Sequence, residues 1–579
     1  MKRKKYTQFS RIAVGTLGLF TVSSCAMFVH KEIKKTHSSA PKPGVHSQTY
    51  IKEKKQMSFD GGALRGAKGV SQYGSPHSSF GHVLVADEVS HYMPRHEEQV
   101  EVEHNTENYS YWSENSFKSS QQDPLSTFSA DVDTASYSNL RRYLNQGTLP
   151  PKDAVRIEEL INYFPYAYEA PKNSEAFSVH VENTKAPWNV KHGLVKIGIK
   201  GKEIEWGKRP SSNLVFLIDV SGSMMDPNKL PLVKKSLALL VEQLGENDRI
   251  SLVVYASATG VVLPSTSATN KTSILQALDR LEAGGSTNGS GGIQLAYSEA
   301  QKNFISGGIN RVILATDGDF NVGISSEGEL VRLIEEKAKS QVFLTVLGFG
   351  SGNLKDSHMQ KMANHGNGQY AYIDSEMEAK KVLVSQAGGT LMTIAKDVKI
   401  QVEFNPKVIS SYRLIGYEKR NLRNEDFNDD LKDAGDIGSG HTVTALYEVV
   451  PVGEKSPALS VDPLKYQKVT ETQIGPSDEA LTVKVRYKKP DESKSQLISQ
   501  IVKNHFPEIS TASNDLRFAA SVASFGMLLK NSEHKGSTSW QSTLELAESS
   551  TKSSDELRQE YLKLLQEASK LDKKLSQLR

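Results

Sequence analysis

A stretch near the middle of the chain carries residues whose types and spacing could do chemistry. Residues 213–224 read NLVFLIDVSGSM, an apolar run that ends in Asp219 and is followed by Ser221 and Ser223. An unbroken apolar run predicts a strand buried on both faces of a mostly parallel sheet. In such sheets ligands bind beyond the carboxyl ends of the strands, where this carboxylate and these hydroxyls would lie. An all-oxygen donor set is what a hard divalent cation prefers.

Two later segments predict oxygen ligands at the same edge of the sheet. The glycine-rich loop 284–292 carries Thr287, and 311–319, RVILATDGD, is a second apolar strand that ends in an acid, Asp317. On its own, the first D-x-S-x-S string could merely cap a turn. With Thr287 and Asp317 following in order, the set favours a cation site, because a short motif gains its meaning from its structural context.

The complete set resembles the metal-ion-dependent adhesion site of von Willebrand factor A domains, with each ligand position matched by Asp219, Ser221, Ser223, Thr287 or Asp317. The resemblance implies that Mg²⁺, or alternatively Mn²⁺ or Ca²⁺, is touched by the hydroxyls and reached by the carboxylates largely through water. Neutral hydroxyls leave much of the charge of the ion uncompensated, so a Glu or Asp carboxylate of a partner protein would complete the coordination. We therefore expect a binding protein with an unidentified protein partner, and no enzymatic activity.

Other functions compete with this interpretation. A nucleotide-binding fold would alternate strands and helices in the same way, but the sequence has no G-x-x-x-x-G-K-[ST] string, and the glycines of 348–352 lack the dinucleotide spacing. A serine hydrolase could use Ser221 or Ser223 with a histidine, but the esterase string G-x-S-x-G is absent. A structural envelope protein, in which the ion only stabilises the domain, is the remaining alternative.

Residues 211–388 predict the domain that positions the site. Strands are expected at 213–218, 249–255, 312–315, 342–347 and 370–373, and helices at 229–244, 274–281, 293–304, 327–340, 354–364 and from 376 onward. Alternation of this kind predicts an α/β fold, a doubly wound and mostly parallel sheet with helices on both faces.

The segments before and after this domain have a different hydrophobic pattern. Alternating apolar and polar residues predict strands at 177–183 and 194–199 before it, and at 398–404, 441–450 and 481–487 after it. Each set is too small to stand alone, so we expect both to form one β-sandwich into which the α/β domain is inserted, with a β-rich region at 395–490.

The N-terminal region 123–205 also predicts helices. After a short strand at 128–133, FSADVD, helices are expected at 134–144, capped by Asp133 or Thr134, and at 154–164, capped by Asp153. The acids around Asp133 echo the metal motif, but they lack a long buried strand before them and are interpreted as capping residues.

The C-terminal region 491–579 predicts helices at 497–505 and 516–529, the second of them buried because it is apolar nearly all round. The last helix carries an apolar seam with spacings of four and three: Leu557, Tyr561, Leu564, Ala568, Leu571, Leu575 and Leu578. Such a seam serves either self-association as a coiled coil or docking on the helix's own domain.

The start of the chain predicts export and a lipid anchor. Residues 1–24 combine a basic beginning with an apolar stretch too short to span a bilayer, and VSSC, which ends at Cys25, resembles a bacterial lipobox. Cys25 is the only cysteine and the expected site of lipid attachment. We expect a cell-envelope protein, in the outer membrane if the cell is Gram-negative. A plain signal peptide or an uncleaved anchor is the alternative.

The composition bears on the segment before residue 123 and on the class of partner. Residues 25–122 are polar and without a sustained period, which predicts a flexible tether, and their histidines do not form the zinc-protease pattern. A formal net charge of +3 gives no electrostatic case for nucleic acid.

The whole arrangement resembles a family of bacterial lipoproteins in which a von Willebrand factor A domain lies between a von Willebrand-associated N-terminal region and a C-terminal domain of unknown function. The resemblance covers about 124–571, and its most recognisable strings are 128–137, FSADVDTASY, 156–159, RIEE, with 162–164, NYF, and 314–323, LATDGDFNVG. The family has no settled activity, so the expected function depends on the ligand set.

Overall fold

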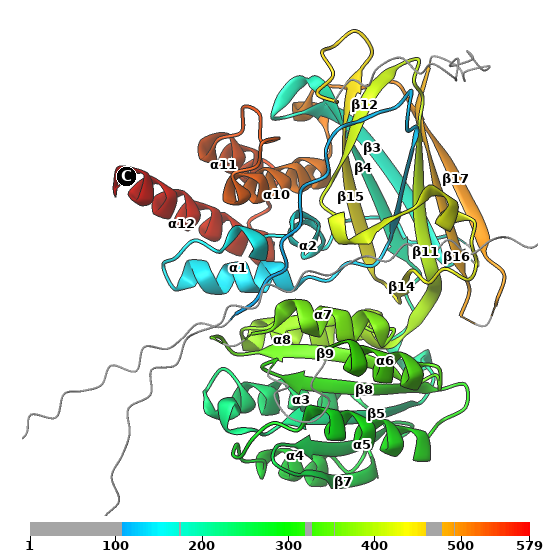
Figure 1. Ribbon diagram of the computed structural model, residues 1–579, viewed down its shortest axis with the longest axis vertical. Coiled ribbons are helices and arrows are strands. Elements are labelled where there is room, and N and C mark those ends of the chain that lie inside the picture. The colour runs from blue at the N-terminus through cyan, green and yellow to red at the C-terminus, as the bar shows by residue number, and fades with distance from the viewer. Residues whose placement is uncertain are drawn as a thin grey trace, which may run out of the picture. The chain divides into compact units, whose positions relative to one another are not determined.

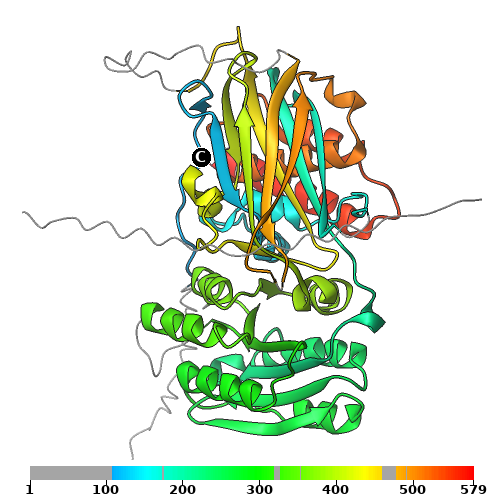
Figure 2. The same cartoon turned by 90° about the vertical axis from the view of Figure 1, so that its right-hand side faces the viewer.

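The computed structural model of the protein describes residues 107–172, 175–318, 327–352, 354–458, 478–490 and 492–578. These residues form an α/β domain, a β-sandwich and a group of helices beside the sandwich (Figures 1 and 2). The predicted signal segment, the lipidation site Cys25 and residues 26–106 of the predicted tether lie outside the described residues. In the described part of the chain, none of the helices combines the length and the apolarity that crossing a membrane requires.

The α/β domain is built on a sheet with the strand order β10-β9-β8-β5-β6-β7. Its strands are β5 Ser212–Asp219, β6 Arg249–Tyr255, β7 Thr259–Ser267, β8 Ile309–Thr316, β9 Phe343–Phe349 and β10 Tyr370–Ile373. Neighbours pair in parallel from β10 to β6, which confirms the predicted doubly wound, mostly parallel sheet. The antiparallel edge strand β7 was not predicted, because Pro264 argues against a strand interior. Proline is tolerated here because β7 is an edge strand, in which Val261 and Val262 are exposed.

Helices cover both faces of this sheet. They are α3 Leu230–Gln243, α4 Lys271–Asp279, α5 Gly289–Lys302, α6 Glu327–Ala338, α7 Asp356–His365 and α8 Glu376–Lys380. On β5, Leu214, Phe216 and Ile218 share a core with α3, α4 and α8. Val215 and Leu217 share another core with α5, α6 and α7. The apolar run is thus buried on both faces, and each such side chain contributes about 1.5 to 3 kcal/mol to folding.

The sandwich consists of one sheet with the order β1-β12-β15-β4-β3 and another with the order β13-β2-β11-β16-β17, in which β14 also pairs with β11. The strands are β1 Lys118–Ser119, β2 Leu125–Ser129, β3 Phe177–Ala186, β4 Asn189–Gly201, β11 Thr393–Phe404, β12 Ile409–Ile415, β13 Asn421–Leu422, β14 Gly435–Gly438, β15 Thr442–Pro451, β16 Glu479–Lys488 and β17 Gln496–Lys503. Strand β4 precedes the α/β domain and β15 follows it, yet they pair, with Ile199 opposite Val443. The predicted insertion is therefore confirmed.

One predicted helix is wrong. Residues 497–505 belong largely to β17, which pairs antiparallel with β16 at the edge of its sheet. Leu497, Ile498, Ile501 and Val502 recur at spacings that also fit a helix face. In the strand, Leu497 and Ile501 are 54% and 53% exposed, while Ile498 and Val502 face the sandwich core.

The N-terminal helices are present, but their predicted caps are wrong. Helix α1, Ala135–Asn145, begins after Thr134, which makes no side-chain capping bond. Asp133 instead accepts hydrogen bonds from the Tyr370 backbone N–H and from Gln360 Nε2. Asp153 lies in a short 3-10 turn before helix α2, Ile157–Asn162. The capping interpretation failed because a local rule cannot anticipate partners from a distant domain.

The predicted tether does not extend to Gln122, because parts of 107–122 contact the folded domains, and Phe117 and Ser120 are buried. Phe117 is buried, with its ring between those of His192 and His534, and β1 pairs with β12. Glu107 accepts hydrogen bonds from Arg142 at 2.9 Å and from the Gly352 backbone N–H at 2.8 Å. A polar segment can thus be ordered by partners far along the chain.

The C-terminal region contains α10 Asn514–Lys530, α11 Trp540–Glu548 and α12 Glu556–Leu578, beside the sandwich in Figure 1. The predicted buried helix is confirmed as α10. In α12, Tyr561 is buried, and its ring centroid lies 5.3 Å from that of Phe518 and 5.5 Å from that of Phe525. Of the two alternatives for the apolar seam, docking on the protein's own helices is therefore confirmed.

Candidate functional site

The predicted metal ligands lie at the point where the order of the α/β sheet reverses. From β5 the chain proceeds to β6 and β7 on one side, and β8 begins the other side. Asp219 is the last residue of β5, and Asp317 directly follows β8. Both side chains are fully buried. Because β5 and β8 are adjacent parallel strands, both carboxylates reach the crevice in which open α/β sheets bind ligands.

The loop that carries Thr287 is tied to the turn after β5. The Gly284 backbone N–H donates to Val220 O at 2.8 Å, and the Gly222 N–H donates to Gly285 O at 2.9 Å. Gly285 has a φ of +82°, a conformation that favours glycine. Thr287 itself is 6% exposed. The structure therefore brings the three predicted segments together.

Hydrogen bonds hold the carboxylate of Asp219 in one orientation. Ser221 N–H donates to Oδ1 at 3.0 Å, while Tyr255 OH and Thr316 Oγ1 donate to Oδ2 at 3.1 Å and 3.0 Å. Burial, assisted by the charge of Asp317, raises the pKa of Asp219 to about 6. The carboxylate is thus ionised at neutral pH and fixed.

The hydroxyls have a spacing that fits a small cation. Ser221 Oγ and Ser223 Oγ lie 3.1 Å apart. Neighbouring ligands of an octahedral Mg²⁺ with bonds of about 2.1 Å are separated by about 3 Å. The described residues contain no group of three or more His, Cys, Asp or Glu side chains that could hold a metal ion. A metal site here would therefore need these hydroxyls.

Lys229 belongs to the site, and sequence reasoning missed it. Its Nζ donates to Ser223 O at 2.9 Å and to Asp317 Oδ2 at 3.2 Å, and the residue is 5% exposed. The side chain passes Gly350, where an added Cβ would lie 2.4 Å from Lys229 Cε. A lysine just before a helix carries no signal for a metal site in the sequence. The only related signal is the glycine at 350, which leaves room for the Lys229 side chain.

The rim of the site is open to solvent. Ser223 is half-buried and Met225 is 64% exposed, and on the neighbouring loops Ser257 and Ser286 are exposed. Ser257 Oγ and Ser286 Oγ lie 3.2 Å apart, which joins these loops. Of the three predicted hydroxyl ligands, only Ser223 reaches this rim, because Ser221 and Thr287 are buried behind it, as are the two carboxylates.

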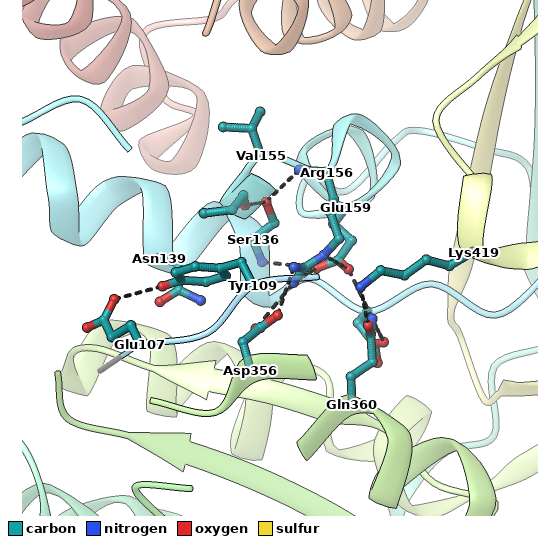
Figure 3. A network of polar contacts seen from close by, with 12 residues as sticks. Glu107, Tyr109, Ser136, Asn139, Val155, Arg156, Glu159, Asp356, Gln360 and Lys419 are labelled. Carbon is teal, nitrogen blue, oxygen red and sulfur yellow. Dashed lines mark hydrogen bonds and ion pairs between the residues drawn. The ribbon is translucent and has the colours of Figure 1, made fainter. Parts of the chain in front are cut away.

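A buried ionic network joins the α/β domain to α1 and α2. Figure 3 shows Arg156 between Glu159 and Asp356; its Nη2 donates to Glu159 Oε2 at 3.0 Å and its Nη1 to Asp356 Oδ2 at 2.8 Å. Arg141 likewise donates to Asp374 Oδ2 at 2.7 Å and to Glu378 Oε2 at 2.8 Å. Residues 156–159 were predicted only as a signature of the family, and their part in this network was not predicted.

Family models match most of the chain. The model described as von Willebrand factor matches residues 103–196, that described as von Willebrand factor type A domain matches 213–386, and that of the C-terminal part of the uncharacterized protein YfbK matches 389–571. Type A domains serve protein–protein interaction in general, and the chain contains such a domain.

Individual proteins and one solved structure are also similar to this chain. "Inter-alpha-trypsin inhibitor heavy chain H1" of Mesocricetus auratus is 26% identical over 202 residues, which cover 33% of this chain and 22% of that protein. A solved structure, "von Willebrand factor type A from Catenulispora acidiphila", is 16% identical, covers 67% of this chain and 88% of its own, and has a TM-score of 0.38. "Uncharacterized protein YfbK" of Escherichia coli (strain K12) is 44% identical over 472 residues, which cover 80% of this chain and 81% of that protein. With its type A domain set between the two flanking regions that the models match, the chain belongs to the family of YfbK.

Proposed function

We propose that the protein is a lipid-anchored component of the cell envelope that binds a protein partner through a Mg²⁺-dependent adhesion site. The observation that supports this most directly is the convergence of the predicted ligands at the switch point of the sheet: Asp219, Ser221, Ser223, Thr287 and Asp317. The ion could be Mn²⁺ or Ca²⁺ instead of Mg²⁺, since all prefer oxygen ligands.

The charge of the site favours an external carboxylate. Asp219, Asp317 and Lys229 are all buried, and these three leave one negative charge in excess; Asp226, 3.6 Å from Lys229 Nζ, adds another, but its side chain is 64% exposed and water screens its charge. A divalent cation would change the balance of these buried groups into one positive charge in excess, at a position that the open rim leaves accessible to a partner. A Glu or Asp side chain of a partner would neutralise that charge, whereas a partner without a carboxylate would leave it uncompensated.

The residues of the chain have distinct roles in this proposal. Ser221, Ser223 and Thr287 would contact the ion, and Asp219 and Asp317 would hold it from behind, partly through water. The bound ion would supply a Lewis-acidic position for the carboxylate of the partner. Catalysis is not part of the proposal: within the described residues, no histidine is hydrogen-bonded to Ser221 or Ser223.

The anchor in this proposal comes from the first residues of the chain. The lipobox-like VSSC places the lipid on Cys25, and the outer membrane is the expected location in a Gram-negative cell. Metabolic labelling with a radioactive fatty acid tests this: label should enter the wild type and not the Cys25→Ala variant. Label in both proteins would contradict the anchor.

Metal binding can be measured without knowing the partner. Mg²⁺ at a hundred times its dissociation constant stabilises a protein by about 2.7 kcal/mol, so Tm should be higher in Mg²⁺ than in chelator. We expect Asp219→Asn to lose this difference. Asp279→Ala, which removes an exposed carboxylate of α4, should keep it. Equal Mg²⁺ effects in all three proteins would place the ion elsewhere.

Partner binding requires a second measurement. Isolated envelopes are crosslinked with the wild type, Asp219→Asn or Asp279→Ala, each with Mg²⁺ or with chelator. A protein captured only in Mg²⁺, and only by the wild type and Asp279→Ala, supports the proposal. Capture indifferent to chelator and to Asp219→Asn rejects it. A Mg²⁺-dependent Tm without Mg²⁺-dependent capture favours the alternative, a structural envelope protein with a stabilising ion.

A further inference from the structure

A second polar site lies at the opposite edge of the same sheet. A cavity of about 350 Å³ lies between the end of α7 and the segment leading into β10, on one side, and the region around β14 of the sandwich, on the other. Arg311, near the start of β8, lines it, whereas Asp317 follows the end of β8. This cavity is therefore separate from the candidate metal site, and an inference about it does not depend on the proposed function.

Arg311 brings a buried charge to this cavity. The residue is 3% exposed, and its Nη1 donates to Thr345 Oγ1 at 2.8 Å. Its Nε has no hydrogen-bond partner, and no carboxylate of the described residues pairs with it. Burial lowers the pKa of Arg311 to about 10, so the side chain stays charged at neutral pH. The guanidinium lies over the Phe343 ring, 5.7 Å from its centroid, but a buried cation without an ion-pair partner is costly, which makes Arg311 a candidate for ligand binding.

The chain is shaped to hold this guanidinium at the wall of the cavity. At Gly368 an added Cβ would lie 1.8 Å from Leu344 O and 3.2 Å from Arg311 Nη1. Only glycine allows the backbone to pass so closely over β9 and over the guanidinium. The preceding Asn367 has a φ of 51°, which makes the required turn. The backbone at Gly368 thus covers the Arg311 guanidinium on one side, and the cavity is the space in which a ligand could contact it.

The facing wall carries charges of both signs, with Lys419, Arg420 and Lys432 among its acids, and one of these acids forms no ion pair in the described residues. Arg420 pairs with Asp131 and with Asp133, in the latter case at 2.9 Å, so these acids are compensated. Asp436 is different: its Oδ1 accepts from the Asp397 backbone N–H at 3.3 Å, and it forms no ion pair within the described residues. Burial raises the pKa of Asp436 to about 7, so this carboxyl is only partly ionised at neutral pH, and an ammonium bound beside it would favour the ionised form.

Arg311 and Asp436 influence each other across the cavity without touching. The charge of Asp436 raises the pKa of Arg311, although burial lowers it more. The separation is too large for an ion pair, so a small molecule with both charges could lie between them. Its carboxylate would accept two parallel N–H bonds from a guanidinium, and its ammonium would donate to a carboxylate.

We propose that this cavity binds a small zwitterion of the amino-acid class, with its carboxylate on Arg311 and its ammonium on Asp436. The volume is at the lower end of the range for small-molecule sites, about 300 to 1,000 Å³, and so suits a ligand of this size. Asn364, Gln369 and Thr390 also line the cavity and supply amide and hydroxyl groups for the rest of the molecule.

The test uses the full chain and defined probes. Glycine, β-alanine and 4-aminobutyrate vary the distance between the two charges, while sodium acetate and ethylammonium chloride each carry one of them. Calorimetric titration and thermal melts are made at matched ionic strength. We expect one amino acid to bind and to raise Tm, and each single-charge probe to bind at least about tenfold more weakly, because it loses one charged hydrogen-bond contact.

Variants decide where the probe binds. Arg311→Met removes a buried charge that has no ion-pair partner in the described residues, so it should fold, and we expect it to lose amino-acid binding. Asp436→Asn should weaken binding by about tenfold. Arg280→Met, at an exposed arginine after α4, should bind as the wild type does. The proposal is overturned if no amino acid binds, if acetate binds as tightly as the best amino acid, or if Arg311→Met binds unchanged.

Discussion

Single residues of the candidate metal site form a balance of buried charges. Asp219 is held by Ser221, Tyr255 and Thr316, and Asp317 lies against Lys229. The ammonium therefore provides positive charge at the place where a divalent ion would also bind. Lys229 thus has an electrostatic role that can be separated from that of the metal ligands.

The Lys229→Met variant tests this role. Removing one member of a buried ion pair costs about 3 to 5 kcal/mol, so we expect the metal-free variant to be less stable by about 3 kcal/mol. Mg²⁺ would supply the missing charge, and the rise in Tm on adding Mg²⁺ should be larger than in the wild type. Lys235→Met, at an exposed pair with Glu376, should behave like the wild type. Equal Mg²⁺ effects in both variants would contradict the idea.

A buried histidine predicts the acid sensitivity of the sandwich. Burial lowers the pKa of His441 to about 4, below its ordinary 6.5. The folded state therefore disfavours the protonated form, and this stability is present above pH 6.5 and is lost as the pH falls toward 4. Between pH 7 and pH 5 we expect the free energy of unfolding of the wild type to fall by up to about 2 kcal/mol more than that of His441→Asn.

Urea unfolding at both pH values measures this difference. His505→Asn, at an exposed histidine, is the matched control and should follow the wild type. If His441→Asn and the wild type lose the same free energy between pH 7 and pH 5, the protonation of His441 does not limit acid stability.

Elements show why some features could be predicted from the sequence and others could not. Strand β5 and the buried acid at its end were predictable, because a long apolar run followed by an acid has few structural solutions. Strand β17 was not, since its apolar residues fit two periods and only the neighbouring β16 decides between them. Lys229 and Asp133 also escaped prediction, because their partners depend on how distant segments meet.

The docking of α12 allows a prediction for a whole element. Tyr561 is fully buried among aromatic rings of α10, so Tyr561→Ala should lower the free energy of unfolding by about 3 to 5 kcal/mol. Leu575 lies on the same seam but is 44% exposed, and Leu575→Ala should change it by less than about 0.5 kcal/mol. Chemical denaturation compares the two. A large, concentration-dependent effect of Leu575→Ala would instead indicate a coiled coil.

The molecule as a whole is held together across its domains by buried ion pairs. Arg156 is 7% exposed and contacts Glu159 of α2 and Asp356 of α7, and Arg141 repeats this pattern with Asp374 and Glu378. Ion pairs so well buried are costly to break on one side. The α/β domain and the helices should therefore unfold as one cooperative unit.

The Arg156→Met variant tests this cooperativity. It leaves Glu159 and Asp356 buried without the guanidinium, so we expect a loss of about 3 to 5 kcal/mol and a calorimetric transition that splits into two. Lys185→Met, at an exposed pair with Glu508, should lose less than about 1 kcal/mol and keep a single transition. A single transition in Arg156→Met would mean that other contacts suffice to couple the domains.

The insertion of the α/β domain between paired strands has a mechanical consequence. The turn around His441 holds the segment entering the domain, through the Gly201 N–H on His441 O at 2.8 Å. It also holds the segment leaving the domain, through the Ser439 N–H on Met392 O at 2.8 Å. A pulling force applied to the α/β domain is therefore divided between two segments that are anchored side by side in the sandwich. Neither segment can be pulled from the sandwich without loading the turn that also holds the other one.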